Sequence, residues 1–463
     1  MRVDAVLADY TARLETLAHR LGLDFYPVDF EMAPSSFMLE ISVYGLPVRM
    51  AHWSYGIRYI HQLIRQGMGH SKIFEVMFPG DPCHAYLTES NSLAEQTLVV
   101  AHVLGHADFA KNNWLFARFH EMTGGRIVEK AASHAQEIDM AIREHGLDRV
   151  EAVLDAALAL ECHIDVNQDV YRPLYSERGA APRAETSPRS SFQGRFAQLP
   201  GAPERRTAPQ PPSRPTLPPY PEYDLLWFAA HYAPELAPWE REIFLAVREE
   251  SFYFYPVFAC QIMNEGWASY WHARLLREAD FLPHDLYVTA IKSHSDVVRP
   301  FASDEQTALS VNPYHLGFSI WDRLIESQGE ERAREVRRDE DDFGFIRNHL
   351  DRALAEELGL LLIESDADGG VRVARGDISQ LKEALLASRF NYGAPRVAVS
   401  ELHADGSLEL IHDSASDGRG LDLERAKRVL DYVARVWRRP VRLHTVDGDG
   451  ESCVVTPADS ATD

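Results

Sequence analysis

Residues 95–113 read EQTLVVAHVLGHADFAKNN, a helix-forming stretch with two histidines one turn apart inside an apolar run. Valine, alanine and leucine surround His102 and His106, so the pattern predicts a helix that is buried on most of its circumference. A buried imidazole needs a partner, because an unpaired buried polar group is costly. The stretch therefore predicts either two hydrogen-bonded core histidines or part of a metal site.

A second stretch, MNEGWASYWH at residues 263–272, contains a carboxylate and a histidine that suit such a site. Two histidines four residues apart, together with a carboxylate from another helix, are a minimal ligand set for a divalent metal. We therefore predict that His102, His106 and Glu265 bind zinc or iron. His272 is either a fourth ligand or a group beside them. Both metals accept imidazole and carboxylate, so the sequence leaves the choice of metal open.

The first stretch lacks the general base of the zinc-peptidase helix, His-Glu-x-x-His. Val103 stands in the place of that glutamate and cannot transfer a proton. Glu95 lies on the same predicted helix face as the two histidines, so Glu95 and His272 are the predicted catalytic residues. The alternative for Glu95 is a solvated or capping carboxylate. Polar neighbours predicted to orient ligands or substrate are Asn264, Lys111, Asn112 and Asn113.

The charge balance argues against two classes of partner. The 463 residues include 70 Asp or Glu and 47 Lys or Arg, which gives a net charge of −23. Such a charge predicts no general binding to nucleic acid and no attraction to an anionic membrane surface. Four scattered cysteines without a Cys-x-x-Cys motif fit a reducing compartment. We expect a cytoplasmic protein with no membrane span, because neither a signal-peptide core nor a long apolar run is visible.

A proline-rich segment interrupts the helical part of the chain. Helical periodicity runs through residues 4–22, 95–119 and 127–165, and it resumes from residue 223. Between them, residues 176–221 hold 11 of the 26 prolines, and such a segment buries too little apolar surface to offset its ordering entropy. We predict a disordered linker at 176–221 inside one mainly helical domain, residues 1–335.

From about Leu361 the hydrophobic period changes from 3.6 to two residues. Two hairpins are predicted at 361–375 and 397–412, each followed by a helix, at 378–388 and 422–437. Two final strands are predicted at 441–445 and 452–455. The predicted fold class is α+β, with a large mainly helical N-terminal domain and a small α+β domain at 340–458. The small domain shows no catalytic pattern, so we interpret it as an interaction or regulatory module.

Several motifs resemble the stage V sporulation protein R (SpoVR) family. The longest is Asn264-Glu265-Gly266-Trp267-Ala268-Ser269-Tyr270-Trp271-His272, and the resemblance covers nearly the whole chain outside the linker. One departure is Val257, where family members often carry Gln. The other matching segments are Tyr86–Glu89, Ala101–His106, Phe109–Asn113, Pro238–Glu242, Tyr253–Pro256, Asn312–Phe318 and Arg439–Leu443.

The resemblance implies a cytoplasmic bacterial protein linked to spore cortex formation, or to a stress response beside a serine protein kinase and a von Willebrand-type partner. It implies no established biochemical activity, so two functions stay open. The first is a metal-dependent enzyme, either a hydrolase of amide or peptidoglycan-related bonds or a non-haem iron protein. The second is a non-catalytic scaffold for partners of the kinase system. Val103 favours the scaffold, whereas the buried polar residues favour the enzyme.

Overall fold

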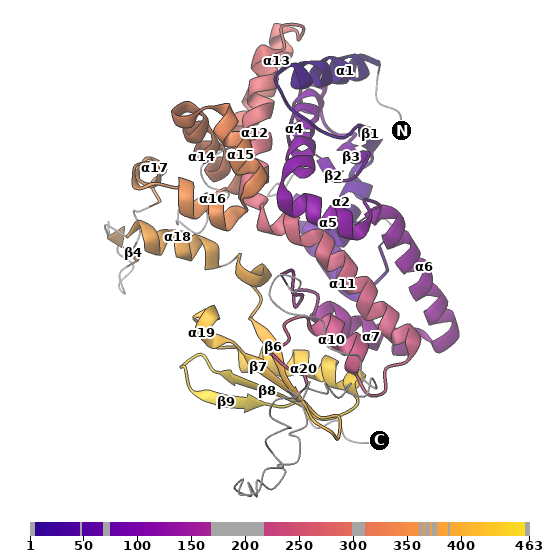
Figure 1. Cartoon of the computed structure of the whole chain (residues 1–463). Helices are drawn as coiled ribbons and strands as arrows, with labels where there is room; N and C mark the ends of the chain where they lie inside the picture. The colour runs from indigo at the N-terminus through magenta and orange to yellow at the C-terminus, as the bar shows by residue number, and fades with distance from the viewer. Residues whose placement is uncertain are drawn as a thin grey trace, which may run out of the picture. The chain divides into compact units, whose positions relative to one another are not determined.

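The computed structural model describes residues 5–46, 49–67, 75–167, 217–298, 311–360, 364–365, 371–372, 377–387 and 389–458. Helices dominate these residues, and a small sheet-bearing part follows at the C-terminal end, which confirms the predicted α+β fold class (Figure 1). Within the described part of the chain, no helix is both long and apolar enough to cross a membrane. The predicted linker lies outside the described residues except for 217–221.

Internal contacts divide the chain into two units, Met1–Glu151 with Ala246–Ala394 and Ala152–Leu245 with Pro395–Asp463. The contacts thus group residues 152–245 with the C-terminal sheet, whereas the predicted domains were the consecutive ranges 1–335 and 340–458. The chain passes from one unit to the other within α7 (Leu147–Ala159), within α11 (Pro238–Ala259) and again between Ala394 and Pro395.

The first unit is mainly helical. Its N-terminal segment contains α1 (Ala5–Arg20), α2 (Ser35–Tyr44), α3 (Trp53–Gly67), α4 (Leu93–Asn112), α5 (Trp114–Thr123) and α6 (Ile127–His145). Its later segment contains α12 (Gln261–Glu278), α13 (His284–Val297), α14 (Pro313–Gln328), α15 (Glu330–Asp339), α16 (Asp342–His349), α17 (Arg352–Glu357) and α18 (Ile378–Ala387). Between α17 and α18, β4 (Glu364–Ser365) and β5 (Val371–Arg372) pair antiparallel, as the predicted hairpin requires.

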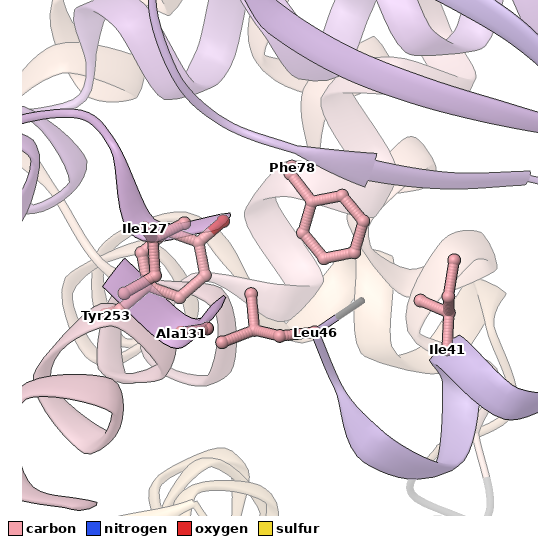
Figure 2. Packing of buried hydrophobic residues seen from close by; sticks show 6 residues of the cluster. All are labelled: Ile41, Leu46, Phe78, Ile127, Ala131 and Tyr253. Carbon is pink, nitrogen blue, oxygen red and sulfur yellow. The ribbon is translucent and has the colours of Figure 1, made fainter. Parts of the chain in front are cut away.

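A three-stranded sheet, which the sequence analysis did not predict, lies in the first unit. Its order is β1-β3-β2, formed by β1 (Val28–Ala33), β2 (Glu75–Phe78) and β3 (Cys83–Thr88). Strand β1 is parallel to β3 and β2 is antiparallel to it. Figure 2 shows Phe78 at the end of β2 in an apolar cluster with Ile41, Leu46, Ile127, Ala131 and Tyr253. This packing holds β2, and therefore Glu75 at its start, against the helices.

Helices α4, α12 and α14 pack at very short range because glycines face their neighbours (Figure 1). A Cβ atom on Gly105 of α4 would lie 2.7 Å from the Cα of Ala268 on α12. A Cβ on Gly317 of α14 would overlap the backbone of α12 at Ile262 and Gly266. Real Cβ atoms do not approach backbone this closely, so the absence of a side chain sets the spacing of the three helices.

The start of α12 is held by two long-range contacts. The Asp342 carboxylate accepts hydrogen bonds from the backbone N–H groups of Ile262 and Met263, both at 2.9 Å. The indole of Trp321 donates to the carbonyl oxygen of Met263 at 2.9 Å. Because the first N–H groups of a helix lack intrahelical partners, Asp342 supplies the cap that α12 does not provide itself. Glu265 lies two residues after Met263, so these contacts also fix the position of Glu265.

The second unit contains a four-stranded sheet of order β6-β7-β8-β9. The strands are β6 (Val397–Leu402), β7 (Leu408–His412), β8 (Val441–Val446) and β9 (Ser452–Val455), with α20 (Leu423–Trp437) between β7 and β8. The β6–β7 and β8–β9 pairs are antiparallel, which confirms the predicted strands, and β7 lies parallel to β8. This unit also contains helix α10 (Leu225–Tyr232), the short α19 (Ser414–Asp417) and parts of α7 and α11.

The residues just before α10 extend that sheet. Glu222 forms an isolated bridge with Val399 of β6, and its N–H donates to the Val399 carbonyl at 3.0 Å. The carbonyl oxygen of Leu217 accepts a hydrogen bond from Leu402 at 2.6 Å. Residues 217–222 therefore lie along the free edge of β6, so residues 217–221 of the predicted linker pair with the sheet, and the rest of that prediction lies outside the described residues.

His134 of α6 makes the stability of the first unit depend on pH. Its ring nitrogens lie 3.3 Å from carboxylate oxygens of Glu249 and of Glu250. Burial alone would lower its pKa, but the hydrogen bonds to the two carboxylates outweigh burial and raise the pKa to about 9. The stabilisation is therefore fully present below pH ~6.5, the ordinary histidine pKa, and is lost as the pH rises towards 9.

We expect His134→Gln to lower the free energy of unfolding by about 1–2 kcal/mol at pH 6, since solvent screening reduces the full ~3 kcal/mol of the shift at this partly exposed site. Lys130 pairs with Glu249 and Arg49 with Glu250, so neither carboxylate is left alone. The difference between the variant and the parent should shrink by pH 9.5 in urea titrations. A difference that stays constant with pH would contradict this assignment.

Candidate metal centre

Helix α4 presents the two histidines in a fully enclosed setting. Every residue from 96 to 110 is buried, which confirms the predicted buried helix. The helix begins with a capping box: Glu95 accepts a hydrogen bond from the Ser92 N–H at 2.7 Å, and Ser92 accepts one from the Glu95 N–H at 3.3 Å. The Glu95 carboxylate is thus engaged at the helix N-terminus, about 10 Å along the axis from His102. This geometry supports the capping alternative and not the predicted catalytic role.

The structure brings His102, His106 and Glu265 together, as predicted. The Glu265 Oε2 atom lies 3.4 Å from the Nε2 atom of His106 and 3.6 Å from that of His102. All three ligand-type atoms lie within 4.8 Å of one another. These separations are longer than an ordinary N–H···O bond of about 2.7–3.2 Å. They match the ~3.4 Å that separates two tetrahedral ligands at 2.0–2.2 Å from one ion.

Two buried polar atoms of the cluster lack a hydrogen-bond partner. Within the described residues, the Nε2 atom of His102 and the Oε2 atom of Glu265 are buried and have no hydrogen-bond partner. His102 itself is only 3% exposed. Leaving buried polar atoms unpaired is unfavourable, and each such case in a folded protein calls for an explanation. Both atoms face the same point, so an ion at that point would satisfy both.

The opposite ring nitrogens of both histidines are held by residues of α12. The Nδ1 atom of His106 lies 2.9 Å from the Oδ1 atom of Asn264, so the imidazole donates and its Nε2 keeps a free lone pair. The Nδ1 atom of His102 lies 2.8 Å from Nδ1 of His272. Metal-binding histidines use their second nitrogen in this way, which orients the ring. Asn264 therefore contacts His106 in the way that its predicted orienting role requires, and that role stays a prediction.

His272 is part of a buried chain of imidazoles. Its Nδ1 atom faces His102, and its Nε2 atom lies 2.5 Å from Nδ1 of His294 on α13. Burial, followed by the neighbouring His102, lowers the pKa of His272 well below its ordinary value, so the ring is neutral. Both ring nitrogens of His272 are engaged, so its contacts favour a role in orienting His102 over that of a fourth ligand. Its predicted catalytic role gains no support from this geometry.

Two further residues at the cluster were missed by sequence reasoning. The Oε1 atom of Glu75 on β2 lies 3.9 Å from Nε2 of His102. The ring of Tyr314 on α14 stacks against that of His102, with centroids 6.1 Å apart. Nothing in the local pattern around Glu75 indicates a site, whereas Tyr314 lies in the motif Asn312–Phe318 that was already noted as family-like.

The protonation states of Glu265 and His102 suit metal binding, whereas at His106 the burial that lowers the pKa is outweighed by Glu265, which raises it. Burial would raise the pKa of Glu265, but the two histidines outweigh it and hold that pKa well below the usual range. Burial and the neighbouring His106 lower the pKa of His102 to about 4. Burial also raises the pKa of Glu75 to about 7, opposed by His106 and aided by Glu265. A charged carboxylate beside a neutral imidazole is the form in which these groups bind metals.

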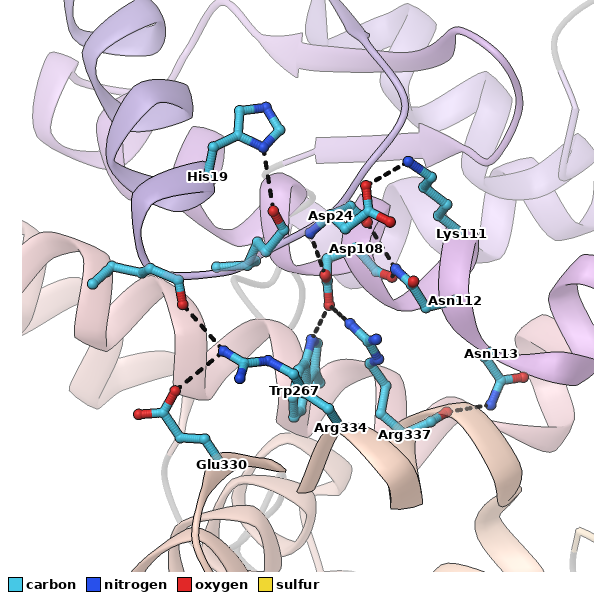
Figure 3. A network of polar contacts seen from close by, with 12 residues as sticks. His19, Asp24, Asp108, Lys111, Asn112, Asn113, Trp267, Glu330, Arg334 and Arg337 are labelled. Atoms are coloured by element: carbon cyan, nitrogen blue, oxygen red, sulfur yellow. Dashed lines mark hydrogen bonds and ion pairs between the residues drawn. The ribbon is translucent and has the colours of Figure 1, made fainter. Parts of the chain in front are cut away.

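Three residues predicted to orient ligands or substrate serve elsewhere. Lys111 forms an ion pair with Asp24 at 2.5 Å, and the Asn112 amide donates to the carbonyl oxygen of Asp24 at 2.7 Å. The Asn113 amide donates to the carbonyl oxygen of Arg337 at 2.8 Å (Figure 3). These contacts hold the C-terminal end of α4 to its neighbours, so the structure gives the predicted orienting role no support at these three residues.

Comparisons with known proteins agree with the motifs. The family model described as SpoVR like protein matches residues 3–392, and the model described as SpoVR-like C-terminal domain matches residues 396–448. A protein of Escherichia coli (strain K12) named uncharacterized protein YcgB is 28% identical over 484 aligned positions, covering 95% of this chain and 92% of that protein. No solved structure matches. The extent of the two family matches shows that the chain belongs to the SpoVR family.

Proposed function

We propose that His102, His106 and Glu265 bind one divalent metal ion, zinc or iron, and that the protein is a metal-dependent hydrolase. The observation that carries the proposal is the pair of buried atoms without a hydrogen-bond partner, Nε2 of His102 and Oε2 of Glu265, which face one point at ligand-like separation. Two structural histidines would instead direct both nitrogens to hydrogen-bond partners, since buried polar groups are paired in stable folds.

A metal bound by two histidines and one carboxylate supplies a Lewis acid and an activated water. The remaining chemistry falls to side chains of this chain. Glu75 is the carboxylate next to the ligand set, 3.9 Å from His102 Nε2 on the side of β2. It takes the place of the base that Val103 cannot provide. Asn264 accepts from Nδ1 of His106 and so leaves the Nε2 of that ring free, and His272 contacts Nδ1 of His102 and orients that ring.

Family membership supports the biological part of the proposal. We place the reaction in spore cortex formation or in a stress response, with an amide or peptidoglycan-related bond as substrate class. The proposed partners are a serine protein kinase system and a von Willebrand-type protein. The non-catalytic scaffold for those partners remains the alternative, and metal content separates the two functions.

Metal analysis of the purified full-length chain tests the proposal. We expect about one zinc or iron ion per chain in the parent, and at least about 100-fold weaker metal binding in Glu265→Gln, which keeps the side-chain volume. Asn264→Ala should weaken binding about 10–100-fold, the usual effect of losing a group that orients a ligand. The matched control is His61→Gln, which alters an exposed histidine of α3 and should keep its metal.

The decisive negative result is a parent protein that is folded and metal-free and is not stabilised against heat by added Zn²⁺ or Fe²⁺. Binding of a ligand to the folded state must raise the melting temperature when the ligand exceeds its dissociation constant. Such a result would identify His102 and His106 as structural residues of the core and would favour the scaffold function.

A further inference from the structure

The candidate metal centre is more open on the side of its carboxylates. The side chains of Glu75 and Glu265 are 18% and 20% exposed. Those of His102 and His106 are 4% and 9% exposed, so the two imidazoles lie deeper in the protein. Tyr314, in the first turn of α14, is also partly exposed. A substrate therefore has access to the centre from the side of the two carboxylates and the phenol.

Tyr314 is held in place by several contacts. Its ring stacks against that of His102, with centroids 6.1 Å apart and an angle of 22° between the ring planes. The start of α14 is fixed by its cap, because Asn312 accepts a hydrogen bond from the Tyr314 N–H at 3.1 Å. About one turn later, Gly317 packs directly against the backbone of α12. The phenol is thus positioned before a substrate arrives, as groups that stabilise a transition state must be.

The hydroxyl group of Tyr314 lies beside both carboxylates of the centre. It forms a hydrogen bond with Glu265 and interacts electrostatically with Glu75. Charged carboxylates only accept hydrogen bonds, so the phenol is the donor in its contact with Glu265. Glu265 is a proposed ligand and Glu75 the proposed base, so a substrate that reacts between them meets the same hydroxyl.

We propose that Tyr314 donates a hydrogen bond to the carbonyl oxygen of an amide substrate and stabilises the negative charge that develops there. This inference rests on the proposed hydrolase function and adds a catalytic residue to it. When the substrate binds, the hydroxyl exchanges the Glu265 carboxylate for the substrate oxygen. Tyrosine is one of the side chains that form oxyanion holes, and such donors act best when they are fixed before the reaction begins.

Amide hydrolysis needs such a donor because negative charge builds up on the carbonyl oxygen. A lone pair of the water oxygen forms the new C–O bond, Glu75 takes one proton from the water, and the π electrons of the carbonyl group move to its oxygen. When the C=O bond forms again, the C–N bond breaks and the leaving nitrogen takes the proton from Glu75. The products are a carboxylic acid and an amine, and Tyr314 keeps its proton throughout.

Binding of methylphosphonate to the zinc-loaded full-length protein tests this role. Methylphosphonate is a tetrahedral anion that mimics the oxyanion formed from an acetamide group, whereas acetate is planar. In titration calorimetry, we expect Tyr314→Phe to weaken methylphosphonate binding at least about 10-fold and acetate binding less than about 3-fold, because transition-state analogues gain most from such a donor. The zinc content should equal that of the parent, since the variant keeps the ring that stacks on His102. The matched control is Tyr220→Phe, which removes the hydroxyl group of a tyrosine that is 62% exposed.

Three results for Tyr314→Phe would overturn the inference. Unchanged affinity for methylphosphonate would show that the hydroxyl does not contact the bound anion. Equal weakening of both anions would show that the hydroxyl does not distinguish the oxyanion from a planar group. Loss of zinc at an unchanged melting temperature would make Tyr314 part of metal binding instead of a donor to the substrate. A parent protein that binds no zinc is a separate failure, because it overturns the proposed metal centre itself.

Discussion

Replacing Asp108 with alanine is expected to lower the free energy of unfolding by about 3–5 kcal/mol, because the change leaves a buried arginine uncompensated. Asp108 is fully buried on α4. Its carboxylate accepts hydrogen bonds from Arg337 at 2.5 Å, from the Trp267 indole at 2.8 Å and from the Asp24 backbone at 2.8 Å (Figure 3). Asp108 thus connects α4 to α15, to α12 and to the segment that follows α1. The single substitution therefore removes three contacts.

Urea denaturation followed by circular dichroism measures this effect. The matched control is Asp9→Ala, which removes the carboxylate of an exposed ion pair with Arg13 on α1. That pair should contribute no more than about 0.5 kcal/mol, as exposed helix pairs do. Combining Asp108→Ala with Arg337→Met should restore part of the stability, since the orphaned charge is gone. If Asp108→Ala alone cost less than ~1 kcal/mol, the guanidinium of Arg337 would have another partner or access to water.

Gly317→Ala is expected to cost about 1–3 kcal/mol or more, because the added methyl group overlaps backbone rather than a movable side chain. Helix α14 would have to move away from α12 at Ile262 and Gly266, next to Glu265. We therefore also expect the variant to lose metal affinity if the proposed site is correct. The stability effect stands without the metal.

Gly56→Ala is the matched control for that substitution. Gly56 lies in α3, and a Cβ atom there would meet nothing within 4 Å. The same change should be neutral or stabilise the protein by up to ~1 kcal/mol, since alanine is the better helix former. Both variants are compared by thermal and urea denaturation. Equal effects of the two substitutions would show that close packing at Gly317 is not what holds α12 and α14 together.

Local sequence patterns were sufficient to predict those segments whose structure depends on their own residues. The strands of the C-terminal sheet and helix α20 agree with the predicted ranges, because period-two alternation and Asp-Gly turns act over a few residues. Helix α4 was predicted as buried because its sequence is apolar over most of its circumference. The three proposed ligands were found by chemical type, since few residue kinds can bind a metal.

Other assignments gain no support from the structure, because one residue type can serve several purposes. A glutamate near the start of a helix can either cap the helix or act in catalysis. At Glu95 the capping box with Ser92 engages the carboxylate. Lys111, Asn112 and Asn113 look like site residues in sequence, but their partners are Asp24 and Arg337. These partners lie far away in the chain, and no local pattern indicates them.

The sequence by itself determined the strands of the C-terminal sheet, the burial of α4 and which residue types can bind a metal, because these follow from local periodicity and side-chain chemistry. Only the tertiary structure decided which elements meet. Glu75 joins the cluster through the packing of β2, and Glu265 reaches His106 because Gly105 and Gly317 allow close helix contact. Hydrophobic periodicity indicates that one face of a helix or strand is buried, but it does not indicate which element covers that face. Contacts between residues far apart in the chain therefore depend on the packing of the whole unit.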